Sequence, residues 1–184
     1  MKPAKLKKGD AIGIICPAFS ISTRSPRIPA LEEYLNGLGL SVRYGKSLGA
    51  AYGYLAGDDD LRARDLEDMF EDESIAAIIC MLGGYGSSRI VDKLNYRLIA
   101  SRPKLFVGFS DITVLLNAIY RYAGIPTAHG ALGVYLGNPG FDEFSRRDFE
   151  ALLFQNQKGR VLKNPYDDAE TIVGGAARGI LIGG

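Results

Sequence analysis

A serine stands where an apolar run of strand length gives way to a helical pattern. In the stretch "KLFVGFSDIT", Ser110 follows the run and precedes the expected helix. A hydroxyl at a helix start meets free backbone N–H groups and the positive end of the helix dipole, which suits a nucleophile. The same position is the ordinary place of a helix cap, so Ser110 or Asp111 could equally serve only as a cap. The pattern also departs from the hydrolase elbow G-x-S-x-G, because Ile112 stands at the second glycine.

The second candidate is the glycine-rich stretch "LGGYGSSR", residues 82–89, which follows an earlier apolar run. A Gly-Gly-x-Gly turn lets backbone N–H groups point at an anion, either a phosphate or the oxyanion of an acyl transfer. It is a poor dinucleotide fingerprint, because Arg89 stands where a third glycine should follow Gly84 and Gly86. It also lacks the Gly-Lys-Ser/Thr ending of a Walker loop. A tight strand-to-helix turn without further function remains the alternative.

Apolar runs of strand length alternate along the chain with stretches of helical period. We expect strands over 11–18, 40–45, 74–84, 104–110 and 125–130. We expect helices over 28–38, 58–72, 111–124 and 145–157. This alternation predicts an α/β fold with a mostly parallel sheet flanked by helices, of flavodoxin-like or Rossmann-like build. Ligands bind such sheets beyond the carboxyl ends of the strands, which is where both candidate motifs lie.

Two of the expected helices have a clear apolar face. In the first, the face consists of Ile28, Leu31, Leu35 and Leu38, and Gly39 ends the helix. The second begins with acidic residues, which the helix dipole favours, and its face consists of Leu61, Leu66, Met69 and Phe70. We expect both faces to cover the sheet.

Composition restricts the class of protein. A chain of 184 residues that is 47 % hydrophobic can bury one good-sized core. The formal net charge of +1, with both signs scattered, offers no basic stripe for nucleic acid. No run of about 18 apolar residues occurs, and Pro17 interrupts the first apolar stretch before a signal-peptide core could form. We therefore expect a soluble cytoplasmic protein without a membrane partner, in which Cys16 and Cys80 are buried thiols.

The composition of the chain changes after Phe144. One more helical pattern is followed by a polar, glycine-rich segment that ends in "GILIGG". We expect an α/β domain over residues 1–144, with residues 145–184 forming a helix and a linker that leads toward a further domain. From the strand-like ending without a cap we expect that the natural chain continues.

The two candidate motifs, in this order, resemble those of the LD-carboxypeptidase family, serine peptidases also known as muramoyltetrapeptide carboxypeptidases. Residues 9–20, 56–96, 102–120 and 127–132 carry the resemblance. It implies that Ser110 is the nucleophile. It also implies an oxyanion hole made by the backbone N–H groups of Asp111 and of the turn around Gly84 and Tyr85. No metal or cofactor is implied.

The resemblance implies an activity as well. The family releases the terminal D-alanine from a murein tetrapeptide during cytoplasmic cell-wall recycling, and a related branch cleaves peptide–nucleotide antibiotics and confers immunity to them. The family's serine works with a histidine and a glutamate of a second domain, and many members are homodimers. The single histidine of this chain, His129 in "TAHGAL", is not the family's general base. We expect it to have a structural or substrate-contacting role, and the 184-residue chain to be nearly inactive alone.

Substrate contacts are expected around the glycine-rich turn. Arg89 could hold a substrate carboxylate through its paired donors, or could be a surface ion-pair partner. Gly86 is a further candidate, and Tyr52, Tyr54 and Tyr85 are candidates for the wall of the cleft. A different class of protein also fits the residues, namely a flavodoxin-like small-molecule or nucleotide-binding module in which the turn cradles a phosphate and Ser110 only caps a helix.

Overall fold

The structure is a computed structural model that describes residues 2–155, 159, 161, 164–166, 168 and 170–182. It contains a five-stranded sheet with the strand order β2-β1-β3-β4-β5, and every pairing is parallel. The strands are β1 (Ala11–Ile15), β2 (Ser41–Tyr44), β3 (Ile75–Cys80), β4 (Leu105–Gly108) and β5 (Ala128–His129). The strand order reverses direction between β1 and β3, as in flavodoxin-like sheets. The predicted α/β class is confirmed.

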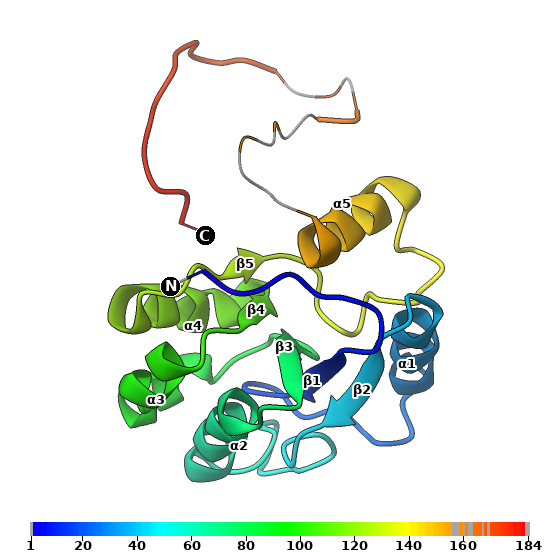
Figure 1. Ribbon diagram of the computed structural model, residues 1–184, viewed down its shortest axis with the longest axis vertical. Helices are drawn as coiled ribbons and strands as arrows, with labels where there is room; N and C mark the ends of the chain where they lie inside the picture. The colour runs from blue at the N-terminus through cyan, green and yellow to red at the C-terminus, as the bar shows by residue number, and fades with distance from the viewer. Residues whose placement is uncertain are drawn as a thin grey trace.

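Helices cover both faces of the sheet (Figure 1). The α-helices are α1 (Arg27–Gly37), α2 (Asp59–Glu71), α3 (Tyr96–Ser101), α4 (Thr113–Ala118) and α5 (Glu143–Phe154). Three further helical segments, which are not α-helical, are η1 (Ser87–Lys93), η2 (Ser110–Ile112) and η3 (Ile119–Ala123). Helices α1 and α5 pack on one face, and α2, α3 and α4 pack on the other.

The core forms two clusters because successive side chains of a strand point to opposite faces. In β3, Ile78 and Cys80 pack toward α2, α3 and α4, whereas Ala77 and Ile79 pack toward α1 and α5. Cys16 and Cys80 are both buried and free, as the sequence predicts. Burial raises the pKa of the Cys16 thiol to about 12, so it is a packing group rather than a nucleophile.

The buried face of α2 differs from the expected one. Leu66, Met69 and Phe70 are buried, but Leu61 is only half-buried, and Arg62 and Asp65 lie in the interior instead. The expectation for Leu61 was therefore wrong. The first turn of α2 lies at the carboxyl edge of the sheet, where its neighbours are loops that present backbone carbonyl and N–H groups, and polar side chains pair with these.

Helix α5 crosses the boundary expected at residue 144. It begins at Glu143 because the Asp142 carboxylate accepts a hydrogen bond from the backbone N–H of Ser145. Phe149 and Leu153 are buried in the same cluster as α1, so the packed unit extends through this helix. Residues 156–158 and 183–184, which belong to the expected helix end and the expected glycine-rich linker, lie outside the described residues. None of the helices within the described residues is long and apolar enough to span a bilayer.

Candidate active site

Segments that follow three strands meet at the carboxyl edge of the sheet. The loop after β1 is tied to the glycine-rich turn after β3, because the Phe19 N–H donates to the Gly83 carbonyl over 3.3 Å. Gly83 lies directly against the turn after β4. A Cβ on Gly83 would lie 3.1 Å from the Cβ of Ser110 and 3.5 Å from the backbone nitrogen of Asp111. The fold thus brings the two candidate motifs into contact, as expected for turns at one edge of a parallel sheet.

Ser110 has an unusual backbone conformation. Its φ is +60°, and it is the one non-glycine residue with a positive φ among the described residues. Phe109 before it is extended, and η2 begins at Ser110, so the chain makes a sharp strand-to-helix turn at the serine. The Ser110 side chain is exposed and makes no hydrogen bond to the described part of the chain. This geometry resembles the strained turn that presents the nucleophile in α/β-hydrolases.

Neither Ser110 nor Asp111 caps the helix that follows. No side-chain cap hydrogen bond occurs at the start of η2 or of α4. The Asp111 carboxylate instead accepts a hydrogen bond of 2.9 Å from the backbone N–H of Ser87, at the far end of the glycine-rich turn. Asp111 therefore links the serine turn to the glycine-rich turn.

An aromatic row lies over the glycine-rich turn. Gly84 has a φ of +113°, and a Cβ there would lie 2.3 Å from the ring of Phe19, so only glycine fits. The Phe19 ring packs against Tyr54, and Tyr54 against Tyr85, with centroid distances of 5.1 and 6.3 Å. Both tyrosines are 56 % exposed. The exposed rings of Tyr54 and Tyr85 are therefore available to a ligand beside the glycine-rich turn.

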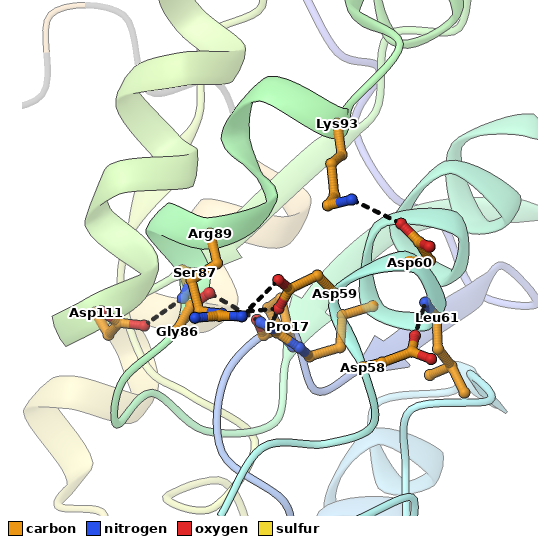
Figure 2. Close-up of polar contacts among 11 residues, drawn as sticks. Pro17, Asp58, Asp59, Asp60, Leu61, Gly86, Ser87, Arg89, Lys93 and Asp111 are labelled. Atoms are coloured by element: carbon orange, nitrogen blue, oxygen red, sulfur yellow. Dashed lines mark hydrogen bonds and ion pairs between the residues drawn. The ribbon is translucent and has the colours of Figure 1, made fainter. Parts of the chain in front are cut away.

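Arg89 makes the ion pair that was one of its two expected roles. Its Nε and Nη2 donate to the two carboxylate oxygens of Asp59, over 2.9 and 2.8 Å (Figure 2). The hydrogen bond from Arg89 lowers the pKa of Asp59 and raises the pKa of Arg89. The Arg89 side chain is still half exposed.

His129 lies on the rim of the same edge, at the end of β5. It is the register partner of Gly108 in β4, and its ring packs against Phe109 with a centroid distance of 5.0 Å. Both side chains line a cleft of about 1000 Å³ between the sheet edge and α5. Phe144, Phe149 and Leu152 form much of its apolar wall. The cleft begins one residue from Ser110.

A profile of the LD-carboxypeptidase N-terminal domain matches residues 12–130, a segment that includes both turns. The chain belongs to the LD-carboxypeptidase family.

Curated relatives agree with this assignment. The probable murein peptide carboxypeptidase of Bacillus subtilis is 38 % identical over 184 residues, which is all of this chain and 56 % of that protein. The murein tetrapeptide carboxypeptidase of Pseudomonas aeruginosa is 38 % identical over 130 residues, covering 68 % of this chain and 40 % of that protein. This LD-carboxypeptidase domain thus spans about half the length of the curated relatives it matches.

A solved structure supports the same fold. The MccF-like protein from Bacillus anthracis superposes with a TM-score of 0.80 and is 35 % identical, over 85 % of this chain and 48 % of that one. MccF itself is a microcin C7 self-immunity protein.

The LD-carboxypeptidase domain also contains a site residue that the sequence reasoning missed. Arg62 is fully buried, and its Nη1 donates to the carbonyls of Pro17 and Gly86 over 2.7 and 2.9 Å. Its Nη2 pairs with Asp59. Burial lowers the pKa of Arg62, and Asp59 opposes that shift. The sequence did indicate that Arg62 is buried, because it lies four residues before Leu66 and so occupies the apolar face of the helix.

Within the residues that the structure describes, no group of three His, Cys, Asp or Glu side chains is arranged to hold a metal ion.

Proposed function

We propose that the protein is a serine-type LD-carboxypeptidase that releases the terminal D-alanine of a murein tetrapeptide through an acyl-enzyme on Ser110. The observation that carries the proposal is the exposed serine with a φ of +60° placed against the glycine-rich turn. Membership of the LD-carboxypeptidase family and the names of the two curated relatives support the substrate class. A cytoplasmic setting, a role in cell-wall recycling and a homodimer belong to the same proposal and rest on the family alone.

In the proposed mechanism, the Ser110 hydroxyl attacks the carbonyl carbon of the amide between the L-centre and D-alanine. The tetrahedral oxyanion accepts hydrogen bonds from the backbone N–H groups of Asp111, Gly84 and Tyr85. The serine proton passes to a base and then to the departing amine of D-alanine. Water hydrolyses the serine ester and returns the proton to Ser110.

Ser110 needs a base, because a serine hydroxyl is scarcely ionised near neutral pH. The described residues place no side chain in a hydrogen bond with it, and the one histidine, His129, packs on Phe109. We propose that the base is the histidine, with its glutamate, that the family carries in a second domain. The 184-residue chain alone should therefore release D-alanine very slowly.

The substrate would lie along the glycine-rich turn toward the cleft. Arg89 offers the terminal carboxylate a donor pair at the exposed side of its ion pair with Asp59. His129 and Phe109 border the cleft on the other side of Ser110. Gly86 is buried and its carbonyl is already bound by Arg62, so its proposed role is to shape the turn rather than to contact substrate.

The decisive test measures D-alanine release from murein tetrapeptide by the complete product of the gene, whose intact mass is determined first. Ser110→Ala should lower kcat by about 10³-fold or more, and a serine-directed fluorophosphonate should label Ser110 in the unaltered protein. Undiminished release by Ser110→Ala would refute the nucleophile assignment. Absence of labelling together with tight binding of a nucleotide would favour the binding-module alternative.

A second candidate substrate is a peptide–nucleotide antibiotic, which a related branch of the family cleaves. The observation that favours it is the similarity to the MccF-like structure from Bacillus anthracis. Assays of both substrates with the same preparation separate the two. A kcat/KM about 10²-fold higher for the conjugate than for the tetrapeptide would replace murein as the proposed substrate.

A further inference from the structure

One peptide unit in the glycine-rich turn is held at both of its polar ends (Figure 2). The Gly86 carbonyl accepts a hydrogen bond of 2.9 Å from Arg62 Nη1. The Ser87 N–H donates to the Asp111 carboxylate, also over 2.9 Å. The Gly86 C=O and the Ser87 N–H belong to the same planar group, so these two hydrogen bonds determine the orientation of that plane. We call this arrangement the peptide clamp.

The peptide clamp joins the segments that form the site. Through Nη1, Arg62 also binds the carbonyl of Pro17 in the loop after β1. Asp111 directly follows Ser110, so the other half of the clamp is attached to the serine turn. The clamped plane follows Gly84 and Tyr85 with one peptide unit, Tyr85–Gly86, in between, and the N–H groups of Gly84 and Tyr85 have no acceptor within the described residues. Holding the clamped plane therefore restricts the conformations open to the turn that carries these N–H groups, which lies against Ser110 at Gly83.

The chemistry of Arg62 fits this task better than a packing role. A fully buried guanidinium is costly, the more so because Arg62 Nε has no hydrogen-bond partner among the described residues, and an apolar residue of similar size would fill the same space at lower cost. The planar fork binds two carbonyls through Nη1 and the carboxylate of Asp59 through Nη2, whereas lysine has only one nitrogen for all three acceptors. Asp111 also favours the charged form of Arg62, so the two halves of the clamp support each other.

We propose that Arg62 is a positioning residue of the oxyanion hole. With the side chain of Asp111, it holds the Gly86–Ser87 peptide in the orientation that directs the N–H groups of Gly84 and Tyr85 toward the oxyanion. Arg62 touches no substrate and acts through the backbone. The catalytic part of this inference rests on the proposed function, whereas the peptide clamp itself does not.

The clamp is tested by amide hydrogen exchange in the 184-residue chain. Arg62→Lys keeps the charge but loses the fork, and the Ser87 amide should then exchange about tenfold faster or more, beyond any change in global unfolding measured in urea. Lys93→Ala is the matched control, because Lys93 pairs with Asp60 across the same two elements without touching the clamped peptide. The control should leave Ser87 exchange unchanged.

If Arg62→Lys does not fold, Asp111→Ala tests the other half of the clamp, since Asp111 lies near the surface. It should release the Ser87 amide to the same extent. Unchanged Ser87 exchange in every variant that folds would overturn the clamp.

Positioning is tested with the complete gene product. Arg62→Lys should lower kcat for D-alanine release by about 10²-fold, with KM changed less than about threefold, because only the transition state carries the oxyanion. An unchanged kcat in a protein whose Ser87 exchange has risen would overturn the positioning role. If Ser110→Ala retained full activity, the proposed function would fail, and the exchange result would still decide whether the clamp exists.

Discussion

At Ser110 the backbone adopts a conformation that a capping serine does not need. N-cap residues have extended backbone angles, whereas Ser110 has a φ of +60°. A non-glycine residue in this region is strained by about 1–3 kcal/mol. The turn directs the side chain to the rim, where Gly83 is close enough that a Cβ would crowd it. The strain therefore supports a chemical role for this hydroxyl.

A pair of substitutions separates the strain from the chemistry. Ser110→Gly should be more stable to urea than Ser110→Ala by about 1 kcal/mol, because glycine adopts a positive φ without steric cost. Both variants should lose labelling by a serine-directed fluorophosphonate. Equal unfolding free energies for the two variants would show that the backbone at this position is not strained.

At the scale of the element, a buried lysine caps the carboxyl end of α2. Lys104 lies just before β4, and its Nζ donates to the carbonyl of Met69 over 2.8 Å and also to that of Asp72. These carbonyls belong to the end of the helix, where a cation is favourable. Burial nevertheless lowers the pKa of Lys104 to about 8, against the opposing effect of Asp72.

This shift predicts a pH dependence of stability. Between about pH 8 and pH 10.5 the unfolded chain binds more protons at Lys104 than the folded chain does, so the free energy of unfolding should rise with pH. The rise should reach about 3 kcal/mol relative to Lys104→Met, which cannot titrate at this position. Urea unfolding of both proteins at several pH values measures the difference, and the other titrating groups are common to both. A difference that did not change with pH would contradict the assignment.

At the scale of the whole molecule, the two core clusters lie on opposite faces of one sheet. Helix α5 belongs to the cluster on the face that α1 covers. Phe149 on this helix is 4 % exposed and packs edge-on against Phe141. The expected boundary at residue 144 would place Phe149 outside the α/β domain. Its burial instead makes α5 part of the structure that supports the cleft beside Ser110.

Phe149→Ala should therefore destabilise the entire α/β unit, by about 3–5 kcal/mol, within a single unfolding transition. Phe144→Ala is the matched control, because Phe144 is 40 % exposed and its replacement should have a small effect. Urea unfolding followed by circular dichroism measures both. A separate early transition in Phe149→Ala would indicate that α5 folds independently of the sheet.

The sequence by itself determined the α/β class, because parallel strands buried on both faces appear as continuous apolar runs. It also located Ser110 and the glycine-rich turn, since each follows such a run and strand ends gather at one edge. It did not determine what the polar groups of the site bind. Burial of Arg62 could be suspected from its place on the apolar face of α2, but its partners Pro17 and Gly86 are distant in sequence.

Only the tertiary structure decided the contacts at the site. Asp111 had a local role available as a helix cap, yet its carboxylate binds Ser87. Arg89 pairs with Asp59 from α2, and α5 joins the core across the expected boundary. These outcomes depend on which segments the strand order β2-β1-β3-β4-β5 places side by side. Local residue patterns indicate where helices, strands and turns form. Which distant segments contact one another is determined by the packing of the sheet and its helices.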